Sequence, residues 1–392
     1  MEKSPISMRK YIGIFGKTNA GKSSLFNALL GQNKAIVSEV SGTTTDPVAK
    51  AMELIGYGAV TLVDTAGFED FGELGAVRIG KTEEILRRCD VAVLVEDIAE
   101  NKKTELKFDN ARVIKVYTKC DKVHKDIIEK KKQEEHNAVF IEKYSDSELD
   151  LLRKRIIEIL LKQDRDDETF LGNILQSGDT VILVIPVDSE APKGRLILPQ
   201  VQILRDCLDN NIRGICVTPD MLEKTILETK RVDLVICDSQ IFGKVSDIVP
   251  NEIDLTSFSM LLANKTARMK QLIDGAKVIE NLKDNDKILM LEACTHNTTH
   301  EDIGKVKIPR LLQKVTGKKL SFTHLSGYDF TDKFLEYDLI IQCGGCMINK
   351  RTIESRLEEF EKNNVPVTNY GVVLAYLNGI LDRASKIFIK NN

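Results

Sequence analysis

Short apolar runs alternate along the chain with longer segments whose apolar residues recur at helical spacing. In the first third, the runs that predict buried strands are residues 11–15, 60–63 and 113–117. Helical spacing follows the first run, and it returns at residues 147–163. Buried strands that alternate with helices predict an α/β fold with a mostly parallel sheet. The polar, acidic residues 164–169 then mark a domain boundary.

The same alternation returns beyond this boundary. Strands are predicted at 181–185, 214–217 and 232–237, with helices at 198–210 and 221–229, which makes a small βαβαβ unit. The last third begins with a long helical segment, residues 257–282. Strands at 287–291 and 338–341 and a helix at 353–363 follow it. We therefore expect a third α/β domain after the βαβαβ unit.

A phosphate-binding loop follows the first predicted strand. Residues 16–23 read G-x-x-x-x-G-K-S and lead directly into a helix. In this motif the backbone N–H groups surround the phosphates, the lysine (Lys22) reaches the β- and γ-phosphates, and the serine (Ser23) offers its oxygen to Mg²⁺. The strand and helix on either side favour this interpretation over an ordinary glycine-rich turn.

Two later segments provide what such a site needs. The strand at 60–63 ends in Asp64-Thr-Ala-Gly67, where Asp64 would hold Mg²⁺ through water and Gly67 would donate its N–H to the γ-phosphate. Between the two motifs, Thr44 and Thr45 are the candidates to complete Mg²⁺ coordination, although an ordinary surface loop is the alternative. Lys22, Asp64 and Gly67 are thus the expected catalytic residues.

Base selection is expected in the loop after the strand at 113–117. Thr118-Lys119-Cys120-Asp121 resembles the N-K-x-D motif of GTPases, in which the aspartate accepts hydrogen bonds that only guanine supplies. Thr118 replaces the usual asparagine, so we expect a weaker tie between this loop and the P-loop. The third base-side element, at residues 140–143, lacks the usual Ser-Ala. The nucleotide contacts predicted here are Gly16, Asn19, Ala20, Gly21, Lys22, Ser23, Ser24, Thr44, Thr45, Lys119 and Asp121.

Hydrolysis is expected to be slow. Phe68 follows the D-T-A-G motif, where Ras-like proteins carry the glutamine that orients the attacking water. Asn19 and the Gly-Thr-Thr-Thr segment at 42–45 resemble potassium-dependent GTPases of the tRNA-modifying and ribosome-assembly type. That resemblance implies that Asn19 ligates K⁺.

Composition narrows the class of protein. No run of 18 uncharged apolar residues occurs, and no cleavage-site pattern follows the apolar segment at 11–15, so we expect a cytoplasmic protein with no membrane segment. A net charge of −3 gives no basic field for nucleic acid, and we expect no nucleic-acid partner. In an intracellular chain, the eight cysteines are expected to be free thiols or metal ligands rather than disulfides.

Two groups of potential metal ligands follow predicted strands of the last third. Cys294-Thr-His296 follows the strand at 287–291, and Cys343-Gly-Gly-Cys346 follows the strand at 338–341. Open α/β sheets place their sites at these strand ends. The spacing favours a [4Fe–4S] cluster with one iron left to a non-cysteine ligand, and leaves zinc or redox cysteines as alternatives. The other five cysteines are expected to be buried or incidental thiols.

A P-loop GTPase joined to these two cysteine groups resembles the [FeFe]-hydrogenase maturation GTPases, the HydF family. Residues 188–200, 301–304 and 368–371 are also similar to segments of that family. The resemblance implies a homodimer that acts as scaffold or carrier for a transiently bound di-iron subcluster precursor. The precursor would be made with radical-SAM maturases and transferred to apo-[FeFe]-hydrogenase.

With this resemblance, the expected α/β domains are a P-loop GTPase domain over residues 1–165, a dimerisation domain over 170–255 and an iron–sulfur cluster-binding domain over 256–392. The expected cofactors are GTP, Mg²⁺, K⁺ and the [4Fe–4S] cluster. The predicted metal ligands are Ser23, Thr45 and Asp64 for Mg²⁺, Asn19 for K⁺, and Cys294, Cys343, Cys346 and His296 for the cluster.

One departure from the family leaves the fourth cluster ligand open. Gln342 stands where the family often has histidine, so the fourth position falls to His296, Glu292, Asp302 or solvent. Two other functions remain as alternatives. One is a potassium-dependent tRNA-modification or ribosome-assembly GTPase with a structural metal site, and the other is a zinc-stabilised regulatory GTPase. The first of these would need basic, aromatic RNA-binding surfaces, which the sequence does not show.

Overall fold

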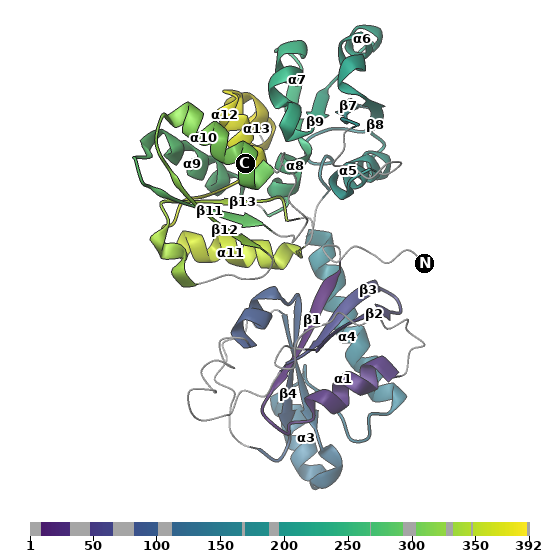
Figure 1. The fold of residues 1–392 in the computed structure, drawn as a ribbon. Coiled ribbons are helices and arrows are strands. Elements are labelled where there is room, and N and C mark those ends of the chain that lie inside the picture. Colours follow the sequence, from purple (N-terminus) through teal and green to yellow (C-terminus); the bar gives the residue numbers. More distant parts are fainter. Residues whose placement is uncertain are drawn as a thin grey trace. The chain divides into compact units, whose positions relative to one another are not determined.

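The computed structural model describes residues 9–31, 48–65, 82–100, 112–166, 169–187, 196–266, 268–292, 303–326, 332–345 and 348–389. The chain divides into two compact units, Met1–Asp166 and Asp167–Asn392 (Figure 1). Both units are built from helices and mostly parallel sheets, which confirms the predicted fold class.

The first unit contains a six-stranded sheet in the order β2-β3-β1-β4-β5-β6, in which β2 runs antiparallel to its neighbour and the other pairs are parallel. Its strands are β1 (Lys10–Gly16), β2 (Val48–Leu54), β3 (Gly58–Asp64), β4 (Val91–Asp97), β5 (Val113–Thr118) and β6 (Val139–Phe140). Its helices include α1 (Lys22–Gly31), α3 (Lys125–Glu134) and α4 (Asp146–Asp166). The predicted strands and helices of this unit are confirmed.

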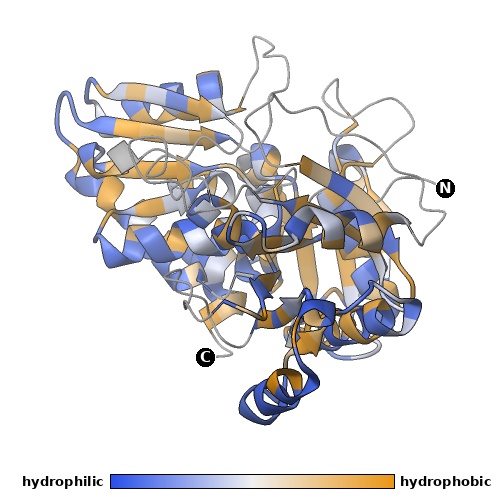
Figure 2. Cartoon of the chain, turned by 90° about the horizontal axis from the view of Figure 1, so that it is seen from below, coloured by the Kyte–Doolittle hydropathy of each residue, from blue (hydrophilic) through white to orange (hydrophobic). Residues whose placement is uncertain are grey.

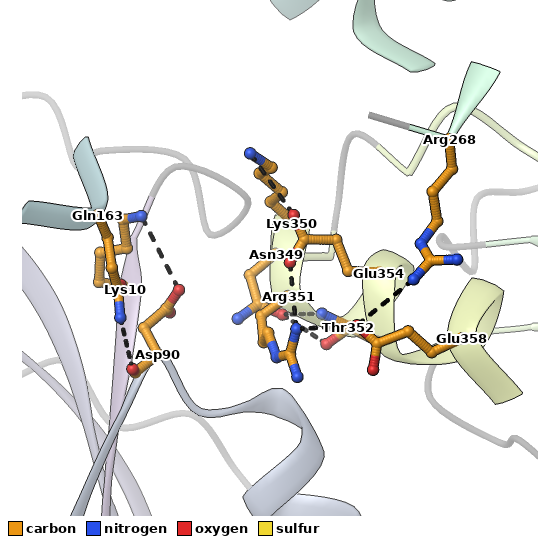
Figure 3. A network of polar contacts seen from close by, with 10 residues as sticks. All are labelled: Lys10, Asp90, Gln163, Arg268, Asn349, Lys350, Arg351, Thr352, Glu354 and Glu358. Atoms are coloured by element: carbon orange, nitrogen blue, oxygen red, sulfur yellow. Dashed lines mark hydrogen bonds and ion pairs between the residues drawn. The ribbon is translucent and has the colours of Figure 1, made fainter. Parts of the chain in front are cut away.

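The core of this unit forms because β1 and β4 are apolar on both faces, and α4 presents one apolar stripe to the sheet. That stripe consists of Leu149, Leu152, Ile156 and Leu160, all buried at helical spacing. Asp90, just before β4, accepts a hydrogen bond from the Tyr11 backbone N–H at 2.7 Å. Its own carbonyl accepts from the Gln163 amide of α4 at 2.9 Å (Figure 3). Asp90 therefore joins β1 and α4 at the start of β4.

The second unit contains two four-stranded sheets, ordered β10-β9-β7-β8 and β12-β11-β13-β14, with all described pairs parallel. The first consists of β7 (Thr180–Val184), β8 (Arg213–Val217), β9 (Leu234–Cys237) and β10 (Asp254–Ser257). The second consists of β11 (Lys287–Glu292), β12 (Ser321–Ser326), β13 (Leu339–Gln342) and β14 (Val367–Asn369). The helices are α5 (Leu198–Asp209), α6 (Leu222–Glu228), α7 (Phe242–Ile248), α8 (Phe258–Asn264), α9 (Met269–Lys277), α10 (Ile308–Thr316), α11 (Lys350–Lys362), α12 (Tyr370–Leu377) and α13 (Leu381–Ile389).

The two sheets of the second unit share one hydrophobic core. A single cluster of buried side chains includes Leu183 and Ile236 from the first sheet and Leu289 and Ile340 from the second. In Figure 2 the strands carry much of the hydrophobic colour, while many helices are hydrophilic along one side. This cluster therefore joins the two sheets, and a second cluster, which includes Ile288 and Ile341, packs separately in the same unit.

The prediction of one long helix over residues 257–282 is wrong. The structure ends β10 at Ser257, and the same residue caps α8 by accepting a hydrogen bond from the Met260 N–H at 3.2 Å. Thr266 then donates its hydroxyl to the Ala263 carbonyl at 2.7 Å, beyond the end of α8. Such local bonds from serine and threonine compete with helix continuation. The segment is therefore a strand end followed by α8 and α9.

The N-terminus of α11 is fixed by a cap and several ion pairs. Asn349 accepts a hydrogen bond from the Thr352 N–H, and Lys350 and Arg351 pair with Glu354 at 3.5 and 3.4 Å (Figure 3). The helix thus starts at Lys350, three residues earlier than predicted. None of the helices within the described ranges is long and apolar enough to cross a membrane.

Candidate nucleotide site and cysteine-bearing sheet edge

The P-loop turns tightly from β1 into α1. The Val95 carbonyl lies where a side chain on Gly16 would begin, so only glycine fits there. Asn19 has φ +63° and Gly21 has φ +95°, both in the left-handed region that glycine and asparagine adopt most readily. These positions bring residues 17–21 over the N-terminus of α1, as the phosphate-binding interpretation requires.

Lys22, Ser23 and Asp64 meet at the start of α1. The Lys22 ammonium donates to the Lys17 carbonyl at 2.7 Å. Burial lowers the pKa of Lys22, and the nearby Asp64 carboxylate opposes that shift. Burial raises the pKa of Asp64, against a hydrogen bond with the Ser23 side chain and the charge of Lys22. The Lys22 ammonium, the Ser23 hydroxyl and the Asp64 carboxylate therefore form one partly desolvated cluster, which we call the P-loop corner.

This corner fits a magnesium ion. Asp64 Oδ1 is buried and has no hydrogen-bond partner among the described residues, so one carboxylate oxygen remains for a further ligand. Ser23 is exposed, and its oxygen lies within hydrogen-bonding reach of the same carboxylate. Mg²⁺ prefers hard oxygen ligands of this kind, with water completing the shell.

The base loop is tied to the P-loop by Thr118. Its fully buried hydroxyl donates to the Ala20 carbonyl at 2.6 Å, with the Glu96 carbonyl at 3.3 Å as a second neighbour. The change from asparagine to threonine therefore keeps a direct contact between the two loops. A hydroxyl has one donor where an amide has two, and here that donor is directed at the P-loop.

Lys119 and Asp121 extend from the same loop. Lys119 has φ +56°, and its ammonium donates to the Asp97 carboxylate at 2.7 Å. Burial alone would raise the pKa of Asp97, but the hydrogen bonds from Lys119 and the Ala99 N–H hold it below its ordinary value. Asp121 is exposed, so its carboxylate is accessible to a nucleotide base.

The third base-side segment is organised by a residue that the sequence reasoning missed. Glu148 accepts hydrogen bonds from the backbone N–H groups of Glu142 and Ser145, both at 2.7 Å, and from the Ser145 hydroxyl at 2.8 Å. Burial works against the charged form, but these bonds leave the pKa of Glu148 lowered. The signal was present in the sequence, because Ser145-x-x-Glu148 is a capping-box pattern before an apolar helix.

The second candidate site begins at the carboxyl edge of the second sheet. Leu291 of β11 lies beside Gln342 of β13, and the Cys343 N–H donates to the Leu291 carbonyl at 2.8 Å. Cys343 is half-buried, whereas Gln342 is buried within the sheet. The two strand ends predicted to carry the cysteine groups are therefore adjacent.

Glu292, the last residue of β11, already has partners at this edge. Its carboxylate accepts from the Tyr370 hydroxyl at 3.2 Å and pairs with the Lys305 ammonium at 3.9 Å. Gly304 passes so close to both that a Cβ on it would overlap the Tyr370 hydroxyl and the Glu292 carboxylate. Glu292 thus already binds Tyr370 and Lys305, which argues against it as the fourth cluster ligand.

Several predicted site residues lie outside the described residues, namely Thr44, Thr45, Gly67, Phe68, Cys294, His296, Asp302 and Cys346. Within the described ranges, no three His, Cys, Asp or Glu side chains gather as a metal site would require. Of the remaining cysteines, Cys89, Cys120, Cys207 and Cys237 are buried, and Cys216 is exposed on β8. Burial raises the pKa of Cys120 and of Cys207 to about 11, so these are unreactive thiols.

The fold and the P-loop corner define the class: the first unit is a P-loop GTPase domain. Residues 11–142 match the family model described as a 50S ribosome-binding GTPase. Residues 170–270 match the hydrogen maturase F dimerization domain, and residues 270–387 match the hydrogen maturase F tetramerization domain. Together these last two span more than half of the chain. The chain belongs to the hydrogen maturase F (HydF) family, as its motifs predicted.

Curated relatives match mainly the GTPase region. The chain is 44% identical to GTPase Der of Wolinella succinogenes over 100 residues, which are 25% of this chain and 21% of that protein. It is 36% identical to GTPase Der of Helicobacter hepaticus over 162 residues, 39% of this chain and 33% of that protein. It is 40% identical to the tRNA modification GTPase MnmE of Xanthomonas oryzae over 116 residues, 28% and 25% of the two chains. The chain thus spans at most a third of these relatives.

Solved GTPase structures also align with the chain. The G domain of the T. maritima FeoB iron transporter aligns at 22% identity and a TM-score of 0.30, over 39% of this chain and 99% of that one. Era in complex with MgGDPNP and a 16S ribosomal RNA segment aligns at 19% identity and a TM-score of 0.29, over 53% and 92% of the two chains.

Proposed function

We propose that this protein is a GTP-hydrolysing scaffold or carrier, which assembles a di-iron subcluster precursor and transfers it to apo-[FeFe]-hydrogenase. The observation that carries the proposal is the combination of a formed P-loop corner in the first unit with two HydF modules in the second. The precursor is cargo, supplied with radical-SAM maturases of the same process. GTP hydrolysis then acts as a slow switch rather than as a source of product.

In the nucleotide site, Lys22 would leave the Lys17 carbonyl and bind the β- and γ-phosphates. Ser23 and Asp64 would hold Mg²⁺, with Thr44 or Thr45 completing its shell, and Gly67 would donate to the γ-phosphate. The Mg²⁺ ion supplies positive charge at the phosphates. A Lys22→Ala variant tests these roles, because GTP turnover should fall by a factor of about 100 or more.

Guanine selection would come from Asp121, whose exposed carboxylate can accept from the N1 and N2 groups of the base. Lys119, fixed by Asp97, would lie over the purine ring. Adenine would leave the Asp121 carboxylate unpaired. We therefore expect Asp121→Asn to exchange guanosine for xanthosine triphosphate as the preferred substrate.

Asn19 would ligate K⁺ from its exposed, left-handed position in the P-loop. The ion would supply charge where other GTPases use an arginine. Turnover should then be markedly faster in KCl than in NaCl, and equal rates in the two salts would exclude this role.

The [4Fe–4S] cluster would be held by Cys294, Cys343 and Cys346, with His296 or solvent at the fourth iron. Cys343 supports this proposal because it is half-buried at an exposed turn, where a side chain on Gly344 would meet open space. Gly345 has φ +71°, which only glycine adopts freely, and it turns the chain toward the N-terminus of α11.

The dimer would form through β8. This strand is one edge of its sheet, and most of its residues are exposed, whereas α13 packs along β10 at the other edge. An open edge is a template for pairing with another strand. Residues 170–255 would thus organise the dimer, and residues 256–392 would hold the cluster and support the further assembly that the family model describes.

Anaerobic reconstitution with iron and sulfide, followed by metal analysis and EPR spectroscopy, tests the cluster. The wild type and a Cys216→Ala control should bind about four iron ions and four sulfides per chain. The Cys343→Ala variant should lose the cluster and keep its GTPase rate. A colourless zinc protein would instead favour a zinc-stabilised regulatory GTPase. A protein that binds neither metal would contradict the cluster-binding part of the proposal.

A further inference from the structure

Tyr144 lies between the two loops that would hold a nucleotide. Its backbone follows β6, next to the base loop, because the Ile141 N–H donates to the Tyr117 carbonyl at 2.8 Å. Its hydroxyl lies at the P-loop, hydrogen-bonded to the Ser24 side chain. A Cβ placed on Gly21 would lie 3.1 Å from that same hydroxyl. The tyrosine side chain thus runs from the base side of the site to its phosphate side.

The backbone of Tyr144 is held in an unusual conformation. Its φ is +55°, a region that aromatic residues rarely adopt because their Cβ crowds the backbone. The three hydrogen bonds that Glu148 accepts from Glu142 and Ser145 fix the chain on both sides of it. A rare conformation persists only where its surroundings impose it, and such residues gather at ligand sites.

The position of the Tyr144 side chain between the P-loop and the base loop predicts which part of a bound nucleotide it would contact. The P-loop N–H groups take the β- and γ-phosphates, and the base loop takes the base, so the ribose and the near face of the base lie between them. Tyr144 is half-buried, which leaves part of its surface accessible. Burial raises its pKa, so the hydroxyl stays protonated at neutral pH.

We propose that Tyr144 is a positioning residue of the nucleotide site, which contacts the nucleoside part of GTP and GDP and contributes to affinity without taking part in hydrolysis. The inference rests on guanine-nucleotide binding by the first unit. An aromatic side chain offers a large, rigid contact surface at low entropic cost, which suits it to a sugar or a base. The phosphates, by contrast, have their own contacts through Lys22 and Ser23.

The decisive variant is Tyr144→Gly, because glycine adopts φ +55° without strain and the variant removes the ring, including its packing against the core. We expect calorimetric titration to show a dissociation constant for GDP, and for a non-hydrolysable GTP analogue, raised about tenfold. The affinity for inorganic triphosphate, which has no nucleoside, should stay within about twofold of the wild type. Tyr144→Phe keeps the ring and should bind GDP nearly as well as the wild type.

Tyr57→Ala is the matched control, because Tyr57 is half-buried against the same hydrophobic core but lies in the turn between β2 and β3. It should lower the melting temperature and leave GDP affinity unchanged. A Tyr144→Gly protein that binds GDP as tightly as the wild type would refute the proposal, and so would an equal loss of triphosphate affinity. A wild type that binds no guanine nucleotide at all would instead refute the GTPase function itself.

A second readout does not depend on affinity. The chain contains no tryptophan, so Tyr144→Trp places a single tryptophan fluorophore at the site. Saturating GDP should change its emission intensity or wavelength, whereas inorganic triphosphate should change it little. Emission that stays the same upon GDP binding would contradict the contact.

Discussion

The hydroxyl of Thr118 provides the sharpest test of how the two halves of the nucleotide site are held together. Its partner, the Ala20 carbonyl, lies 2.6 Å away and 98 residues earlier in the chain, and Thr118 is fully buried. Thr118→Val keeps the shape of the side chain and removes the donor. The Ala20 carbonyl is then left without this hydrogen bond in a position that water does not reach.

Leaving a buried carbonyl without its donor costs about 1–3 kcal/mol. For a unit of this size, a loss near 2 kcal/mol lowers the melting temperature by roughly 4–8 °C. Because the bond also sets the distance between P-loop and base loop, we expect GDP affinity to fall by about tenfold, the equivalent of 1.4 kcal/mol. Differential scanning calorimetry without nucleotide and titration with GDP measure the two effects separately.

Two further variants make the test specific. Thr118→Ser retains the hydroxyl and should recover most of the melting temperature and affinity. Thr256→Val removes a comparable buried bond, from Thr256 to the Ala384 carbonyl at 3.1 Å, in the second unit. It should destabilise that unit without weakening GDP binding. If Thr118→Val melts and binds like the wild type, the bond does not hold the loops together and our reasoning is wrong.

Three other predictions concern single contacts. Gly304→Ala should destabilise the second unit by about 1–3 kcal/mol through overlap with the Tyr370 hydroxyl, and Tyr370→Phe should restore part of that loss in thermal unfolding. The pKa of Glu148 is lowered in the folded protein, so its contribution to stability is present above the ordinary value of 4.5 and is lost as the pH falls through the folded value. Glu148→Gln should therefore flatten the stability profile in acid urea titrations. Arg383→Ala should cost about 3 kcal/mol in urea unfolding, because the guanidinium donates to the carbonyls of Ser246, Val249, Pro250 and Ile253 at 2.6 to 3.3 Å; a loss below 0.5 kcal/mol would contradict this.

The sequence predicts the features that a local residue pattern encodes, such as single strands, helices and the phosphate-binding loop. The strand, glycine loop and helix of residues 11–30 are contiguous, so their order alone indicates a phosphate site. Short apolar runs predicted eight of the strands correctly, but β2, β4, β6, β10, β12 and β14 were not predicted. The break at Ser257 was missed because a serine that ends a strand and caps a helix is, in apolar periodicity alone, one more small residue within a helical segment.

The rest depended on contacts between distant residues. The motif predicted a weakened tie between residue 118 and the P-loop, but not that the Thr118 hydroxyl donates directly to the Ala20 carbonyl. Nothing near Tyr144 shows that its side chain reaches Ser24. The anchor of Tyr370 on Glu292 likewise joins residues 78 positions apart. Such contacts form only after the strands are ordered in the sheet, so a single sequence without its topology does not reveal them.

The position of α13 changes how the two HydF modules should be understood. This helix falls at the end of the segment matched by the tetramerization model, yet it covers β10, the edge strand of the sheet matched by the dimerization model. The contacts are specific, since Thr256 donates to the Ala384 carbonyl and Lys386 pairs with Asp254 at 3.1 Å. Because α13 packs against β10 from within the chain, we propose β8 as the edge that pairs with a partner. The two matched segments therefore belong to one compact unit, and on this proposal the last segment would restrict pairing of the first to β8.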